Sequence, residues 1–134
     1  NLNQLIKIII SALEDIKAND IEILDVTKRA TIFDRMIIAS AVSTRQARAI
    51  ANNVNDKVKE SGGTSYGTEG EGSGEWVLVD LGDVLVHIML PAVRTHYDLE
   101  GLWGELETGV VEQQITSNQS KDNSTLESSR LLAH

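Results

Sequence analysis

Apolar and polar positions alternate most regularly between residues 76 and 90, and this pattern predicts two strands joined by a tight turn. The dipeptide Gly82-Asp83 suits a two-residue hairpin turn. A turn at this place pairs Trp76 with Met89 and Leu78 with His87. The first face of the hairpin is wholly apolar and is expected in the core; it carries Val77, Val79, Leu81, Val84, Val86, Ile88 and Leu90. The second face is mixed and is expected to be a contact surface; it carries Trp76, Leu78, Asp80, Leu85, His87 and Met89.

The rest of the chain alternates between helical and extended patterns. Apolar spacings of three and four predict a helix over residues 2–18 and a second one between a capping box at Ser43–Gln46 and the glycines at 62 and 63. Branched apolar runs predict strands over residues 21–26, 33–40 and 64–68, followed by a flexible glycine loop over residues 69–74. Pro91 is suited to begin a last helical segment that reaches Trp103, with Asp98 capping its final turn. This order of elements predicts an α/β domain with a mixed sheet flanked by helices.

A change in composition divides the chain. Residues 1–105 hold the periodic apolar patterns and are expected to form one domain. Residues 106–134 are rich in Gln, Ser, Asn and Thr, and we expect a polar, disordered tail there.

Negative charge is concentrated in the hairpin half of the chain. The net charge is −8, yet residues 1–65 carry nine basic and eight acidic side chains. Residues 66–103 carry seven acidic side chains and one basic one, Arg94. Such a surface is unsuited to gripping a phosphate backbone and suits a basic protein partner, although an acidic surface that only aids solubility is the plain alternative.

Two further features of the composition bear on location. The chain has no cysteine, which excludes disulfides and thiolate metal sites and fits a reducing compartment. No apolar run reaches the about 18 residues that a membrane-spanning helix needs, so no membrane contact is expected.

The sequence contains only part of the motif that a nucleotidyltransferase needs. A nucleotidyltransferase needs a Gly-Ser turn followed by two carboxylates that alternate on a strand and hold magnesium. Gly72-Ser73 is present, but position 85, where the partner of Asp83 should lie, is Leu85, and starting from Asp80 puts Gly82 in that place. The histidines have no metal-ligand spacing on one element, so we expect no metal, no cofactor and no catalytic residues.

Several segments resemble the ribosomal silencing factor family, also called Iojap-related. The resemblance covers residues 5 to 104. It lies in residues 12–21 (ALEDIKANDI), 36–40 (MIIAS), 43–46 (STRQ), 69–70 (EG), 74–83 (GEWVLVDLGD), 86–87 (VH), 89–91 (MLP), Arg94, 97–100 (YDLE) and 102–103 (LW). Two departures are Arg35, where the family commonly has Tyr, and Ala41-Val42, where a glycine-containing pair is usual.

The resemblance implies a cytoplasmic, non-enzymatic protein with a nucleotidyltransferase-like fold. It implies binding to the large ribosomal subunit through the fourteenth protein of that subunit, with little direct contact to nucleic acid. Such binding blocks subunit joining and represses translation when nutrients are scarce. Some members of the family form homodimers, so a homodimer is also among the expected states. The alternatives are a nucleotidyltransferase-like enzyme and a homodimeric module that binds another basic protein.

The residues expected to bind the partner lie in the acidic half. Trp76 is the leading anchor, because aromatic side chains amid polar neighbours dominate many protein interfaces. Acidic side chains would steer the domain toward Lys and Arg of the partner. The full set expected to bind the partner is Trp76, Leu78, Asp80, Asp83, Met89, Arg94, Tyr97, Asp98, Glu100 and Trp103.

Overall fold

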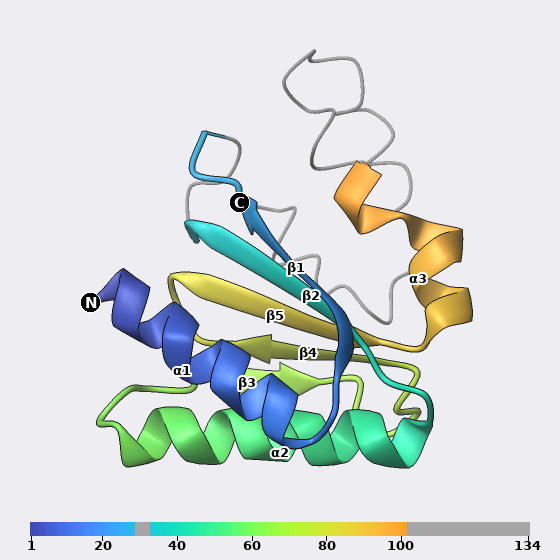
Figure 1. Cartoon of the computed structure of the whole chain (residues 1–134), viewed down its shortest axis with the longest axis horizontal. Coiled ribbons are helices and arrows are strands. Elements are labelled where there is room, and N and C mark those ends of the chain that lie inside the picture. The colour runs from blue at the N-terminus through green and yellow to red at the C-terminus, as the bar shows by residue number, and fades with distance from the viewer. Residues whose placement is uncertain (29–32, 102–134) are drawn as a thin grey trace.

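The computed structural model describes residues 1–28 and 33–101, and over these residues a five-stranded mixed sheet carries three helices (Figure 1). The elements in chain order are α1 (Leu2–Asp15), β1 (Asn19–Asp25), β2 (Arg35–Ser40), α2 (Thr44–Glu60), β3 (Gly67–Glu69), β4 (Trp76–Asp80), β5 (Val84–Met89) and α3 (Pro91–Tyr97). The strand order is β1-β2-β5-β4-β3, with β2 parallel to β5 and the other pairs antiparallel. The predicted α/β fold with a mixed sheet is therefore confirmed. The boundaries of the strands and of the first two helices differ by up to three residues, whereas α3 ends at Tyr97, earlier than the predicted segment that reaches Trp103.

The hairpin of β4 and β5 has the register that the alternation predicts. Trp76 pairs with Met89, and Leu78 pairs with His87. The Leu81 amide donates to the Val84 carbonyl at 3.0 Å, which closes a two-residue turn. Gly82 has φ +87°, as the first central residue of a type II′ turn requires.

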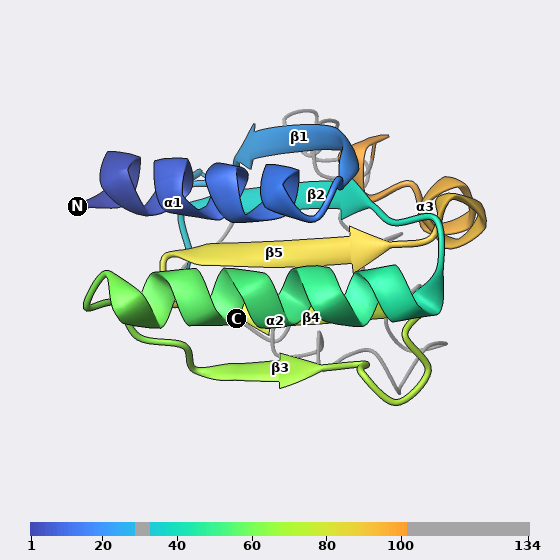
Figure 2. The same ribbon diagram turned by 60° about the horizontal axis from the view of Figure 1, so that its bottom comes forward.

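The first face of the sheet packs against α1 and α2, which run side by side across it (Figure 2). All the predicted core residues of the hairpin lie in this cluster, and Leu90 alone among them is only partly buried. The helices contribute the side chains that recur at spacings of three and four: Ile9, Ala12, Leu13, Ala47, Ile50, Ala51, Val54 and Val58. The predicted amphipathic helices thus form the main core with the apolar face of the hairpin.

The second face of the sheet is more buried than the sequence predicts. A second apolar cluster on this face buries Leu78, Leu85 and Met89 together with Val26, Phe33, Met36 and Ile38. The side chains from β2 and the segments beside it join the hairpin there because β2 lies next to β5 and is apolar on both faces. The prediction of one open contact surface on this face is therefore corrected: the middle of the face is core.

Helix α2 begins with half of the predicted capping box. The Ser43 side chain accepts a hydrogen bond from the Gln46 amide at 3.0 Å. The Gln46 side chain accepts from the Val42 amide, rather than from Ser43, and donates to the Ile16 carbonyl at 2.9 Å. Gln46 thus ties the start of α2 to the end of α1.

The glycine loop between β3 and β4 is tied to α2. Arg48 donates through Nε to the Glu71 carbonyl at 2.8 Å and through Nη2 to the Gly72 carbonyl at 3.2 Å. Gly70 and Gly74 both have positive φ, and Gly74 is buried against Thr44. The sequence predicts a flexible loop, whereas the structure shows a backbone that one guanidinium holds against the helix.

Helix α3 lies at the end of the sheet where β5 ends (Figure 1). Pro91 is its first residue, as predicted, and Asp98 ends it in the left-handed conformation at φ +45°. The Asp98 carboxylate also accepts from the Gly101 amide at 3.3 Å, which agrees with its predicted role as a cap. Trp103 and the predicted tail over residues 106–134 lie outside the described residues. Within the described part, no helix is long and apolar enough to cross a membrane.

We expect Gly70→Ala to lower the free energy of unfolding by about 2 kcal/mol, because Gly70 has φ +87° and an added Cβ would overlap the Trp76 carbonyl. Gly72→Ala is the matched control in the same loop: it has no positive φ and no atom within 4 Å of an added Cβ. Urea unfolding of both variants measures the difference. Equal stabilities would contradict the positive φ and the close packing of Gly70 against Trp76.

Candidate interaction surface

Trp76 lies at the end of the hairpin from which α3 begins. It is the first residue of β4 and pairs with Met89, the last residue of β5. The Leu90 amide donates to the Glu75 carbonyl at 3.0 Å, which extends the pairing to the start of α3. The register therefore brings α3 next to the indole.

The Trp76 indole is half-buried and held on two sides. Its Nε1 donates a hydrogen bond to Nδ1 of His87 at 2.9 Å. Its ring centroid lies 4.9 Å from that of Tyr97 on α3, with the planes tilted by 51°. We call these three residues the Trp76 cluster. The leading predicted anchor is thus neither sealed in the core nor freely mobile.

His87 forms the buried side of the Trp76 cluster. Its side chain is 1% exposed, and burial lowers its pKa to about 3. It is therefore neutral near pH 7, and because Nδ1 accepts from Trp76, its proton lies on Nε2. Among the described residues, no atom accepts a hydrogen bond from Nε2. An unpaired buried donor of this kind costs about 1–3 kcal/mol.

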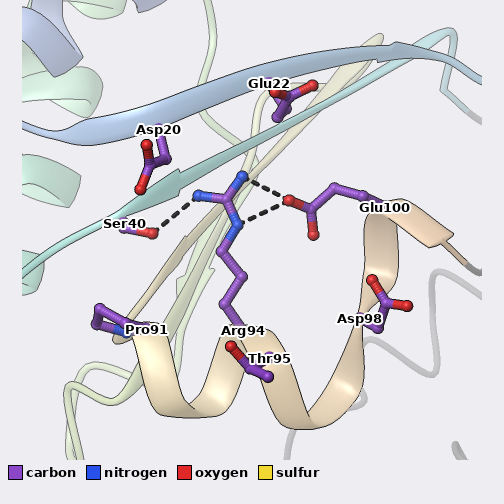
Figure 3. Close-up of a pocket in the computed structure, with 8 residues that line it drawn as sticks. All are labelled: Asp20, Glu22, Ser40, Pro91, Arg94, Thr95, Asp98 and Glu100. Atoms are coloured by element: carbon purple, nitrogen blue, oxygen red, sulfur yellow. Dashed lines mark hydrogen bonds and ion pairs between the residues drawn. The ribbon is translucent and has the colours of Figure 1, made fainter.

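Arg94 fixes α3 to the sheet (Figure 3). Its Nη1 donates to the Ser40 hydroxyl at 2.8 Å, and its Nε donates to a Glu100 carboxylate oxygen at 2.8 Å, which Nη2 also contacts. The Arg94 side chain is 11% exposed. We call Arg94, Ser40 and Glu100 the Arg94 bracket. Arg94 was predicted to bind the partner, whereas in the structure its guanidinium holds α3, the helix that carries Tyr97, against the sheet.

An open hollow of about 580 Å³ surrounds this bracket. Figure 3 shows acidic side chains on both sides of the guanidinium: Asp20 and Glu22 come from β1, and Asp98 and Glu100 come from the segment that follows α3. One arginine therefore lies among four carboxylates, and the rim of the hollow is acidic. A basic side chain of a partner would meet favourable charge there.

The nine predicted site residues that the structure describes, all of the set except Trp103, fall into three groups. Trp76, Arg94, Tyr97, Asp98 and Glu100 lie together at the α3 end. Leu78 and Met89 are 5% and 0% exposed, so they support the surface from beneath and offer no contact area.

Asp80 and Asp83 form the third group, at the opposite end of the hairpin. The Asp80 carboxylate accepts from the Gly82 amide at 3.0 Å, and Asp83 is exposed in the turn. Asp80 lies four residues along β4 from Trp76, which is about 13 Å. These two carboxylates can steer a partner but do not share the Trp76 surface.

Sequence reasoning missed His87 as part of the site, along with Ser40, Asp20 and Glu22. The hairpin register contains the signal for His87, because Trp76 and His87 are diagonal neighbours on one face of the pair. Asp20 and Glu22 lie beside a register shift between β1 and β2, which no local pattern predicts. Ser40 meets Arg94 across 54 residues of chain.

Neither position at which the magnesium motif needs its second carboxylate offers a ligand. Leu85, at the place of the second carboxylate, is 1% exposed, and Gly82 lies in the hairpin turn. Over the described residues, no three His, Cys, Asp or Glu side chains are grouped so that they could hold a metal ion.

Arg35, one of the departures noted in the sequence, has a local partner. Its Nη1 lies 3.3 Å from the Asp25 carboxylate and donates to the Thr27 hydroxyl at 3.1 Å. Hydrogen bonds from Thr27, followed by the charge of Arg35, lower the pKa of Asp25. These residues join β1 to β2 near the ends of their pairing, at Asp25 and Arg35.

Comparisons with known proteins identify relatives of the whole described fold. The family model described as "RsfS: Ribosomal silencing factor during starvation" matches residues 1–132. The ribosomal silencing factor RsfS of Chromobacterium violaceum is 55% identical over 103 residues, which cover 77% of this chain and 84% of that protein. The protein named "Mitochondrial assembly of ribosomal large subunit protein 1" from Mus musculus is 32% identical over 101 residues, covering 73% of this chain and 44% of that protein.

A solved structure agrees with the sequence matches. A crystal structure of a Chromobacterium violaceum protein, 55% identical in sequence, superposes with a TM-score of 0.76 and covers 78% of this chain and 87% of that chain.

We expect Arg94→Met to lower the free energy of unfolding by about 2 kcal/mol, because it removes charge-assisted hydrogen bonds to Glu100 and one to Ser40. Tyr97 should then lose its fixed position beside Trp76, and the near-ultraviolet circular dichroism of the aromatic rings should weaken. Arg45→Met, an exposed arginine on α2, is the control. An unchanged aromatic spectrum in Arg94→Met would contradict the bracket.

We expect His87 to make the fold sensitive to acid. The pKa of His87 is about 3 in the fold against 6.5 in the unfolded chain, so the unfolded chain binds more protons between these values. The stabilisation is complete above pH 6.5 and is lost as the pH falls toward 3. Between pH 7 and 5, protonation of His87 in the unfolded chain should lower the free energy of unfolding by about 2 kcal/mol. His87→Asn should abolish this decrease. His96→Gln, which changes an exposed histidine, is the control and should show the same decrease as the wild type. An identical pH dependence of stability in the wild type and in His87→Asn would contradict the role of His87.

Proposed function

This chain belongs to the ribosomal silencing factor family, and on that premise we propose that it binds the large ribosomal subunit and sterically blocks subunit joining. Translation then falls when nutrients are scarce. The partner on the subunit is its fourteenth protein, which offers a basic surface, and there is little contact to nucleic acid. The binding takes place in the cytoplasm. The relatives' names support a role at the ribosome, and the mouse relative is named for assembly of the large subunit.

The observation that carries the proposed contact is that α3 contributes to both the Trp76 cluster, through Tyr97, and the acidic hollow, through Arg94. A half-buried indole and a tyrosine ring give a rigid aromatic platform, which is the usual composition of an interface hot spot. The carboxylates of Asp98 and Glu100 lie on the same end and favour Lys and Arg of a partner. The α3 end of the domain therefore offers both an aromatic anchor and complementary charge.

The mechanism is competition for space. The bound domain occupies the face of the large subunit that the small subunit needs, so no covalent step is required. Residues 1–105 form the binding domain in this proposal. A domain of this size can block a face by excluded volume alone, provided that its affinity is high enough to keep the face occupied.

We expect Trp76→Ala to weaken binding to purified large subunits by about 30-fold, which corresponds to about 2 kcal/mol of hot-spot energy. Tyr66→Ala is the matched control, because Tyr66 is an aromatic residue with 67% exposure that lies over Gly82 at the opposite end of the hairpin. Filter binding or cosedimentation measures the affinities, and far-ultraviolet circular dichroism checks the fold. Wild-type affinity in a folded Trp76→Ala variant would remove Trp76 from the interface.

We expect the association rate to fall roughly tenfold between about 0.03 M and 0.3 M salt, because acidic steering toward a basic surface is screened. Asp98→Asn should lower the rate and the salt slope, since Asn keeps the side-chain oxygen that accepts from Gly101 and tolerates the left-handed backbone. Asp83→Asn removes the same charge at the far end of the hairpin and should have a smaller effect. A rate that is independent of salt would rule out steering.

A further inference from the structure

We propose that His87 is a positioning residue that holds the Trp76 indole in its binding orientation. This inference rests on the proposed function, in which Trp76 contacts the ribosome. It assigns a role to a buried side chain that touches no partner itself. The role is to accept the indole hydrogen bond and so fix which part of the ring remains outside.

A direct hydrogen bond joins the indole to His87. Trp76 Nε1 lies 2.9 Å from His87 Nδ1, and the ring centroids are 5.8 Å apart with planes tilted by 48°. Because a neutral imidazole has one accepting nitrogen, this bond selects the tautomer with the proton on Nε2. With Tyr97 against the ring as well, the indole is held by two elements, β5 and α3.

His87 lies in an environment that is unfavourable for a polar side chain. Its register neighbours on the same face are Ile38 on β2 and Leu78 on β4, and both are buried and apolar. Nε2 is buried, and no described atom accepts its proton. An apolar side chain would fit this position at lower cost to stability. The single polar interaction that the imidazole makes with a described side chain is the one with Trp76, so orientation of the indole accounts for its presence.

The orientation has a chemical consequence for the partner. Since Nε1 already donates to His87, the indole has no donor left to offer. The partner therefore meets the rings of Trp76 and Tyr97 without a donor from the indole, and the carboxylates of the hollow lie at the same end of the domain. This combination suits a basic protein surface, whose Lys and Arg stems can pack on the rings and whose charged groups can meet the acids.

The first test reads the hydrogen bond without any ribosome. Proton exchange of the Trp76 indole N–H is followed by NMR in the full chain, with Trp103→Phe used to assign the two indole signals. In the wild type we expect exchange at least about tenfold slower than for a free indole, and His87→Leu should bring it close to the free rate. Wild-type exchange at the free rate overturns the inference directly.

The second test uses a conservative replacement as rescue. His87→Asn places a carbonyl oxygen where Nδ1 lies, so it should restore slow exchange and most of the binding. His87→Leu should keep or raise the midpoint of thermal unfolding and weaken binding to large subunits by about tenfold. If the Leu variant is less stable than expected, the Asn variant still tests the role of His87. A purely structural role does not predict that His87→Asn restores slow exchange of the Trp76 indole N–H.

The outcomes separate this inference from the proposed function. Loss of binding in Trp76→Ala with full binding in His87→Leu would overturn the role of His87 and leave the proposed contact intact. Full binding in both variants would overturn both. Weak binding in Trp76→Ala and His87→Leu, with recovery in His87→Asn, supports both.

Discussion

The antiparallel register of β4 and β5 determines both the main core and the place of Trp76. Because side chains alternate, this one register places a continuous apolar face against α1 and α2. It also puts Trp76 diagonal to His87 on the other face. A slip by one residue would expose the core face and separate the indole from its acceptor. The turn at Gly82, with its positive φ, is the local feature that sets the register.

A second constraint is the attachment of α3 to the sheet. The helix has no buried side chain of its own, so packing alone holds it weakly. The Arg94 bracket supplies charge-assisted hydrogen bonds to β2 and to the turn after α3. Tyr97 reaches Trp76 because the helix is held in this way. The Trp76 cluster and the acidic hollow are therefore two results of one docking arrangement.

The sequence predicts those parts of the structure that depend on local patterns. The hairpin register, the Ser43 cap and the start of α3 at Pro91 each follow from a few adjacent residues, and the structure confirms them. Burial of the second face was missed because it depends on which strand lies beside β5, a property of topology. The contact between Arg94 and Ser40 was missed for the same reason.

Candidate site residues show the same division. Trp76 and Tyr97 were selected by residue type and by resemblance to the ribosomal silencing factor family, and the structure brings their rings together. Met89 was selected from an alternating pattern that assigns a face but not its exposure, and it is fully buried. An alternating pattern predicts which side chains share a face, while the neighbouring elements decide which of them reach solvent.

Subunit association, measured by light scattering, shows whether the bound protein excludes the small subunit. The protein is added in excess to purified large subunits, and small subunits follow. We expect association to fall in proportion to the fraction of large subunits that the protein occupies. Association should be unaffected when the protein is instead incubated with small subunits and then removed. Complete association at saturating occupancy of the large subunit would contradict the proposed block of subunit joining.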